Sequence, residues 1–307
     1  MDTKSAQEWD QICNRWAKGP ADTEQQKCAN AVRMVRDVIT THTAFKNRSI
    51  KVFIQGSYRN RTNVRMESDV DICVLCENTV FSDYTLTPGV NDNLLGFSPA
   101  TYSFAELKQD VEAALVAKFG RLAVKRGNKA FDIKENTYRV AADVVPTFEG
   151  RLYYKDQSGG LYYYSGTVLQ CDSDGGTINN WPEQHYANGV KRHDATNQQF
   201  KKKVRILKNL CNEMVAVGIV SAKSMASFLL ESLVYNCPDE VFTQSTHYDD
   251  IKSVITYLLD VTETDEKAKR MLEVNNIKYL FHDSQPWKRA DVYDFLLSAW
   301  NYAGFGS

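Results

Sequence analysis

Two aspartates separated by one residue in an apolar stretch constrain this sequence more than any other feature. Asp69 and Asp71 belong to DVDICVL, residues 69–75, a composition that predicts a β-strand. Because side chains alternate along a strand, both carboxylates face one side, while Val70 and Ile72 face the core. Two adjacent carboxylates repel each other, so the pattern favours a cation between them. Mg²⁺ suits such oxygen ligands.

A third aspartate, Asp143, lies near the middle of a second apolar stretch, YRVAADVVP, residues 138–146. A lone carboxylate would be costly to bury there unpaired. If the two strands are neighbours, Asp69, Asp71 and Asp143 can hold two metal ions about 3.5–4 Å apart. One ion would lower the pKa of an attacking hydroxyl and the other would neutralise a triphosphate. The sequence therefore predicts two Mg²⁺ ions per site, with Mn²⁺ as a substitute.

A glycine–serine pair precedes these aspartates. The predicted strand KVFIQ, residues 51–55, ends at Gly56, and the chain then turns into a helix. Backbone N–H groups at a helix start bind phosphate, and glycine allows a close approach to the anion. Ser57 adds a hydroxyl donor. Either motif alone is common and often structural, but their combination with a third aspartate predicts a phosphate-transfer site.

The remaining pattern predicts an α+β protein with a mixed amino-terminal half and a helical carboxyl-terminal half. We expect two domains, residues 1–195 with the amino-terminal helices and residues 196–307. A loop is expected over 82–99, and a hairpin around Gly159-Gly160. The expected helices are 21–45, 104–119, 195–217 and 222–235, with others within 248–261, 263–274 and 287–303; the expected further strands are 122–125, 130–134, 151–155 and 161–164.

Composition limits the setting in which the protein works. The formal net charge of −1 shows no basic excess, which argues against stable nucleic-acid binding. A polar amino end and the lack of a run of about 18 apolar residues predict a cytoplasmic protein without a membrane segment. The seven scattered cysteines suggest free thiols in a reducing compartment. Cys73 and Cys76 point to opposite faces of their strand, so we expect them to be buried and structural.

The stretch GSYRNRTNVRMESDVDICV, residues 56–74, resembles the signature of DNA polymerase β-like nucleotidyltransferases. Its longer form is similar to the cyclic-oligonucleotide synthases of bacterial antiphage defence, the CD-NTases. These are relatives of animal cyclic GMP-AMP synthase and of oligoadenylate synthase. The likeness covers roughly residues 30–300, and it extends to AADVVPTF (141–148) and to residues 178–193, 200–210 and 227–238.

The resemblance implies a polymerase β-like core packed on a helical lobe, with the active site in the cleft between them. It implies that Gly56 and Ser57 hold the donor phosphates. Lys208 and Ser227 would contact the triphosphate, and Phe228 would stack on the donor base. Asp69, Asp71 and Asp143 would be the catalytic metal ligands, with Asp143 also the base for the acceptor hydroxyl.

A basic stripe supports one of these assignments. Lys201, Arg205 and Lys208 recur at helical spacing and can form one cationic face. Such a face can meet a triphosphate, or it can be an ordinary solvated surface, and the resemblance selects Lys208 alone. Phenylalanine at helical spacing, as at Phe228, is more often part of a core. The candidates for base contacts are Asn179, Asn180 and His185.

The predicted activity joins two ribonucleoside triphosphates, donor and acceptor, into a cyclic di- or oligonucleotide second messenger and releases pyrophosphate. A regulatory protein or a phage-derived activator is an expected further partner. One alternative is a linear-product transferase, such as an oligoadenylate synthase-like enzyme or a tRNA-modifying toxin. Another is a catalytically inactive nucleotide sensor, against which the three aspartates argue.

Overall fold

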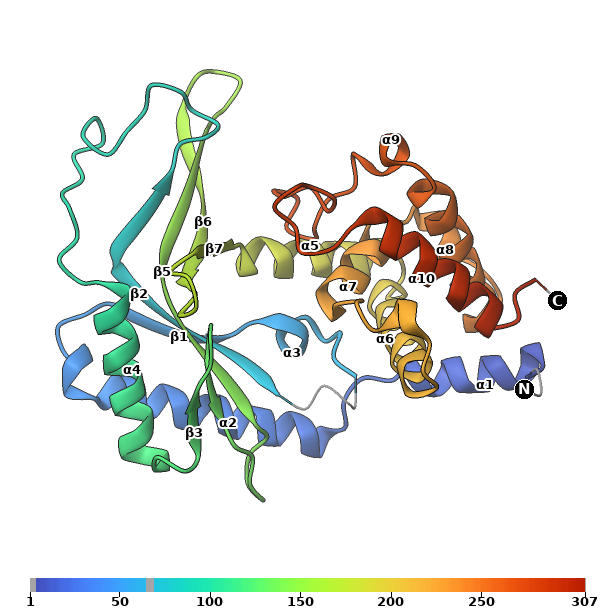
Figure 1. Cartoon of the computed structure of the whole chain (residues 1–307), viewed down its shortest axis with the longest axis horizontal. Helices are drawn as coiled ribbons and strands as arrows, with labels where there is room; N and C mark the ends of the chain where they lie inside the picture. Colours follow the sequence, from blue (N-terminus) through green and yellow to red (C-terminus); the bar gives the residue numbers. More distant parts are fainter. Residues whose placement is uncertain (1–3, 65–68, 307) are drawn as a thin grey trace. The chain divides into compact units, whose positions relative to one another are not determined.

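The computed structural model of the chain describes residues 4–64 and 69–306. They divide into two compact units (Figure 1). Of the described residues, the sheet unit takes in 21–59 and 69–183, and the helical unit takes in 4–20, 60–64 and 184–306. The stretch from Gly56 to Asp71 is called the glycine–aspartate motif below. Its residues 65–68 lie outside the described residues.

The sheet unit is built on one mixed sheet, to which the described residues contribute seven strands in the order β1-β2-β5-β4-β3, with β6 and β7 continuing from β5. Strands β2 and β5 run parallel, and the other pairs are antiparallel. The strands are β1 Ile50–Ile54, β2 Val70–Asp83, β3 Val124–Arg126, β4 Phe131–Ile133, β5 Ala142–Lys155, β6 Leu161–Gln170 and β7 Thr177–Asn180.

Strand β5 joins two segments that the sequence analysis treated as separate strands. The strand predicted at 138–146 begins only at Ala142, and it continues through the strand predicted at 151–155 as one strand of 14 residues. Its first part pairs with β4 and its second part with β6, and β2 lies along its other side. The hairpin expected around Gly159-Gly160 is confirmed, because Lys155 of β5 is in register with Leu161 of β6.

Helices α2 (Asp22–Thr41) and α4 (Phe104–Phe119) pack against the sheet, and the short η1 (Thr43–Phe45) follows α2. The helix predicted at 104–119 is confirmed. Ser103 and Glu106 form a capping box at its start, and Gly120 follows its last residue. The buried apolar side chains of α2 and α4 form one cluster with Val70, Ile72 and Val144 of the sheet. Because side chains alternate along a strand, Asp71 and Asp143 face the opposite side of the sheet.

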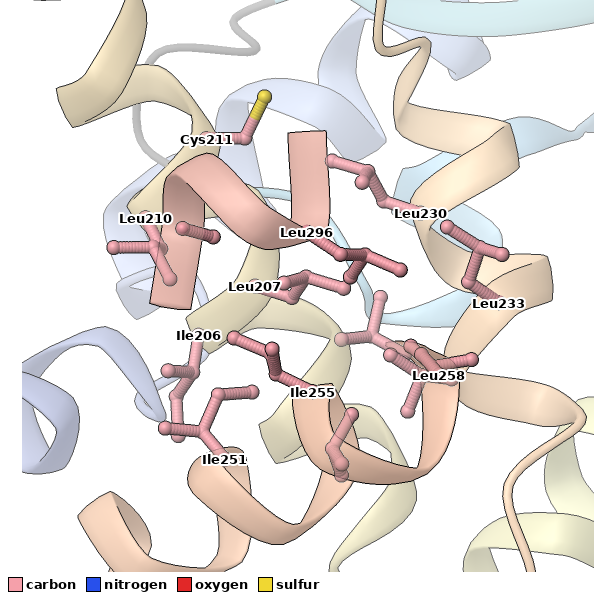
Figure 2. Packing of buried hydrophobic residues seen from close by; sticks show 14 of the residues in the cluster. Ile206, Leu207, Leu210, Cys211, Leu230, Leu233, Ile251, Ile255, Leu258 and Leu296 are labelled. Atoms are coloured by element: carbon pink, nitrogen blue, oxygen red, sulfur yellow. The ribbon is translucent and has the colours of Figure 1, made fainter. Parts of the chain in front are cut away.

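The helical unit packs α1 with the carboxyl-terminal helices. Trp9 and Cys13 of α1 are buried in the same cluster as Leu207, Ile255 and Leu296. Figure 2 shows these last three side chains packed together. The domain division expected from the sequence placed this first helix with the catalytic core, whereas its apolar face packs in the helical unit. The unit's elements are α1 Ala6–Trp16, α5 Pro182–Ala195, α6 Phe200–Ala216, η2 Val220–Ala222, α7 Ser227–Tyr235, η3 Asp239–Phe242, α8 His247–Thr262, α9 Asp265–Ala268 and α10 Arg289–Tyr302.

Two elements between residues 170 and 195 were not predicted. The residues Thr177–Asn180 form β7, and the residues after Trp181 form α5, which begins with proline at its first helical position. The helix expected within 263–274 is limited to the four residues of α9.

The cysteines agree with the predicted free thiols. All seven cysteines are free and buried, as predicted for Cys73 and Cys76. The Cys73 sulfur contacts the Thr147 hydroxyl at 3.1 Å. In the part of the chain that the structure describes, no helix is both long and apolar enough to span a membrane.

Candidate active site

Three aspartates form a row across neighbouring strands of the sheet unit. Asp71 of β2 is in register with Asp143 of β5, and Asp143 is in register with Asp132 of β4. Residues in register on adjacent strands point to the same face, and adjacent strands lie about 4.8 Å apart. The predicted adjacency of the two strands is confirmed. Asp132 was missed, because the short β4 gives no sequence signal of its position beside Asp143.

The row brings the negative charges of several carboxylates close together. Burial, the charges of Asp132 and Asp69, and a hydrogen bond to Asp132 together raise the pKa of Asp143 to about 6. Asp69 is exposed and lies directly before β2. Like charges gathered on one face disfavour the ionised state of the group between them, unless a cation binds there.

Gly56 shapes the space beside Asp71. It is the first residue of the short helix α3, Gly56–Asn60, and has a φ of +67°. A Cβ at this position would lie 2.1 Å from Oδ2 of Asp71, so the carboxylate lies directly against the glycine backbone. Any other residue would displace the carboxylate. Ser57 follows in the same helix, and the Tyr58 hydroxyl, which donates to Glu24 at 2.8 Å, ties this helix to α2.

These residues fit a bound magnesium ion. Asp69, Asp71 and Asp143 offer only carboxylate oxygens, the ligand type that Mg²⁺ prefers. The raised pKa of Asp143 and the Asp71 carboxylate held against Gly56 agree with a cation at this face. Within residues 4–64 and 69–306, no three His, Cys, Asp or Glu side chains are already arranged to enclose a metal ion. The assignment of the three aspartates as metal ligands therefore stays a prediction from donor chemistry and charge.

The three other predicted nucleotide-binding residues lie in the helical unit. Lys208 of α6 is only 1% exposed, and Ser227 is the first residue of α7. Phe228 follows it and keeps 37% of its surface exposed, with its ring centre 5.5 Å from that of His185 and 6.0 Å from that of Trp287. Phe228 is thus not a core residue, and it presents an open aromatic surface.

The rest of the basic stripe does not form a solvated face. Lys201 and Arg205 are both buried. The Arg205 guanidinium donates from Nε to the Ala17 carbonyl at 2.9 Å and from Nη1 to the Arg61 carbonyl at 2.6 Å. Arg205 therefore holds the segment after α3 against the end of α1.

The candidates for base contacts differ in their surroundings. Asn179 and Asn180 lie on β7 and line a narrow pocket of the sheet unit with Thr167. His185 of α5 is buried, and its Nε2 pairs with Oε1 of Glu231 at 2.9 Å. That ring nitrogen is therefore engaged within the protein.

Glu231 of α7 was also missed. It is 3% exposed, and its Oε2 accepts a hydrogen bond from the Thr62 hydroxyl at 2.7 Å. Thr62 belongs to the glycine–aspartate motif and precedes Glu231 by 169 residues. No local pattern connects two positions so far apart.

Known proteins resemble this chain in sequence. The family model for the C-terminal helical domain of cGAS/DncV-like nucleotidyltransferases matches residues 187–304. The cyclic dipyrimidine nucleotide synthase CdnE of Legionella pneumophila is 44% identical over 295 residues, which cover 96% of this chain and 98% of the relative.

Solved structures match nearly the whole chain. The CdnE cyclic dinucleotide synthase of Elizabethkingia meningoseptica, with GTP and Apcpp, is 32% identical with a TM-score of 0.78, covering 96% of this chain and 98% of that one. The c-UMP-AMP synthase CdnE of Rhodothermus marinus, with Apcpp and Upnpp, is 27% identical with a TM-score of 0.82, covering 97% of each.

The mixed sheet, the carboxylate row with its glycine and the matched helical domain define a nucleotidyltransferase. The chain belongs to the CD-NTase family of cGAS/DncV-like nucleotidyltransferases. The resemblance read from the motif is thereby confirmed, as is a fold consistent with the polymerase β-like core and a helical carboxyl-terminal domain.

Proposed function

We propose that the chain joins ribonucleoside triphosphates into a cyclic dinucleotide and releases pyrophosphate in a Mg²⁺-dependent reaction. One observation carries this proposal: Asp71 and Asp143 lie in register on parallel strands, with the Asp71 carboxylate held against Gly56. The relatives named as cyclic nucleotide synthases support the cyclic product. The same comparison speaks against an inactive sensor.

The relatives also bear on the substrate. The enzyme at 44% identity is named a cyclic dipyrimidine nucleotide synthase, and the Rhodothermus marinus enzyme is named a c-UMP-AMP synthase. The Elizabethkingia meningoseptica structure contains GTP and Apcpp, and its identity to this chain is lower than that of the dipyrimidine enzyme. We therefore propose that pyrimidine ribonucleoside triphosphates, UTP and CTP, are the preferred substrates.

In the proposed reaction, a ribose hydroxyl of the acceptor attacks the α-phosphorus of the donor. A new oxygen–phosphorus bond forms, the bond to the bridging oxygen breaks, and pyrophosphate leaves. Asp143 accepts the hydroxyl proton. When bound at Asp69, Asp71 and Asp143, Mg²⁺ would neutralise the triphosphate charge and favour the attacking alkoxide. A second transfer in the same site closes the ring.

The remaining residues would hold the donor. Gly56 and Ser57 would bind its phosphates through backbone N–H groups and the serine hydroxyl. Lys208 and Ser227 would contact the triphosphate, and the open surface of Phe228 would stack on the base. Catalysis would rest on this positioning and on neutralisation of charge, without a covalent enzyme intermediate.

We further propose that the product is a second messenger in bacterial antiphage signalling and that the enzyme works in the cytoplasm. The free thiols support a reducing compartment. A regulatory protein or a phage-derived activator would then control when the messenger is made.

The test is direct. Purified protein is incubated with all four α-labelled ribonucleoside triphosphates and with Mg²⁺ or Mn²⁺, and the products are treated with phosphatase. A labelled, phosphatase-resistant product supports cyclisation, and omission of one nucleotide at a time names its bases. A phosphatase-sensitive oligomer would replace the proposal with a linear transferase. If neither metal gives product, the assay is repeated with lysate from phage-infected cells, and continued absence of product would contradict the proposal.

A further inference from the structure

Glu231 is a buried carboxylate for which the proposed chemistry has no role. Its two oxygens bind two different elements of the helical unit: Oε1 pairs with His185 of α5, and Oε2 accepts from Thr62 in the segment after α3. A buried carboxylate with both oxygens hydrogen-bonded restrains every group that it contacts. Glu231 therefore links α5 and α7 to the motif segment.

The neighbours of this carboxylate are the residues expected to hold the donor nucleotide. Ser227 precedes Glu231 by one turn of α7, so their side chains lie on the same helix face. The His185 ring that pairs with Glu231 also contacts the Phe228 ring. Lys208 lies close enough for its charge to act on Glu231. Ser227 and Lys208 are thus neighbours of this one group, and Phe228 is linked to it through His185.

Charge explains why the arrangement is stable. Burial opposes ionisation of Glu231, but His185 and Lys208, with the Thr62 hydrogen bond, outweigh it and lower the pKa to about 2. The carboxylate is therefore ionised at neutral pH. In return it supplies a fixed negative charge to Lys208, a fully buried lysine that needs such compensation.

We infer that Glu231 is a positioning residue for the donor-nucleotide site. Through Thr62 it fixes the motif segment to α7, and through His185 and Lys208 it orients the aromatic surface and the ammonium that face the donor. This inference rests on the proposed function, since it assumes that Lys208, Ser227 and Phe228 bind the donor.

Glu231→Gln and Thr62→Val test the role with nearly unchanged shape. The glutamine removes the charge, and the valine removes one hydrogen-bond donor. The matched control is Asp250→Asn, which breaks another buried ion pair of the same unit, with Lys203. For each protein we would measure thermal stability, KM and kcat with UTP, and the Kd for a UTP analogue with a non-hydrolysable α,β bond and Mg²⁺.

We expect Glu231→Gln to weaken analogue binding and raise KM about tenfold, and Thr62→Val to do so about threefold, with smaller changes in kcat. Thr62→Ser restores the hydroxyl and should restore wild-type binding. Asp250→Asn should lower thermal stability but leave the analogue Kd unchanged. If Glu231→Gln does not fold, the Thr62 pair carries the same test.

Wild-type Kd and KM in both Glu231→Gln and Thr62→Val, with lowered thermal stability, would overturn the positioning role and leave a purely structural one. The wild-type protein separates this outcome from failure of the proposed function. If it binds the analogue and makes cyclic product while the variants match it, only the inference fails. If wild-type protein neither binds the analogue nor makes product, the proposed function fails, and the inference fails with it.

Discussion

The carboxylate row of the sheet unit and the Glu231 network of the helical unit use the same functional group in opposite ways. Asp71, Asp143 and Asp132 stand in register with like charges side by side. Glu231 instead has each of its oxygens bonded to a donor of its own unit. One region gathers negative charge, and the other balances it.

The sign of the resulting pKa shifts shows what each region needs. The pKa of Asp143 is raised, because burial and its acidic neighbours oppose ionisation. The pKa of Glu231 is lowered, because nearby positive charge and hydrogen bonds outweigh burial. A bound cation would relieve the repulsion in the first region, whereas the charge of Glu231 is balanced by groups of the chain itself. This contrast agrees with the proposed catalytic role of the aspartate row and with the inferred positioning role of Glu231.

The largest expected effect concerns the row. Asp71→Asn should lower cyclic-product formation by about 10³-fold or more, because it removes a predicted metal ligand. The melting temperature should stay the same or rise, since the change relieves repulsion between carboxylates. Product formation from labelled triphosphates and a thermal melt measure the two effects. Asp156→Asn, in the exposed hairpin turn, is the control and should remain active. Near-normal product from Asp71→Asn would contradict the metal-ligand assignment.

The Glu231 network should make the free energy of unfolding depend on pH. The Glu231 pKa is lowered from 4.5 to about 2, so its contribution is complete above about pH 4.5 and is lost as the pH falls toward 2. For this shift the loss is roughly 3 kcal/mol. The free energy of unfolding in urea, measured from pH 6 to 3, should fall more steeply for wild-type protein than for Glu231→Gln. Equal slopes would show that Glu231 is not held in its ionised form by His185 and Lys208.

A pair of glycines sharpens the description of the row. Gly56→Ala should reduce activity about 10²-fold, because the new methyl group would collide with the Asp71 carboxylate. Gly159→Ala at the hairpin tip is matched, since it also has a positive φ but nothing within 4 Å of the added Cβ. It should cost about 1 kcal/mol of stability and no activity. Similar activities for the two variants would mean that Gly56 is needed only for its positive φ and not for its contact with the Asp71 carboxylate.

The smallest effect concerns Phe228. Phe228→Ala should raise KM for the donor about tenfold, because a stacking surface for the base is lost. Phe228→Tyr keeps that surface and should behave as wild type. Steady-state kinetics with UTP measures both. An unchanged KM in the alanine variant would remove Phe228 from the donor site and weaken the link between the Glu231 network and nucleotide binding.

Much of the site could be predicted from local spacing. The alternation in DVDICVL predicts a strand with its acids on one face, and Val70 and Ile72 are indeed buried while Asp71 is not. The helix at 104–119 was predicted from its apolar spacing, and a Ser103–Glu106 capping box and Gly120 mark its ends. Such features depend on neighbours a few residues away, so they are visible in the sequence.

Only the tertiary structure decided which distant groups meet. Asp132 joins the row because β4 pairs with β5 in one register, and a shift by one residue would turn its side chain to the other face. Thr62 meets Glu231 across 169 residues because α3 is followed by a segment that packs in the helical unit. The sequence by itself determined the chemistry of the aspartates and their strand. Strand pairing and helix packing are not encoded by local spacing. They determined that Asp143 lies among other carboxylates and that Glu231 lies among positive charges and hydrogen-bond donors.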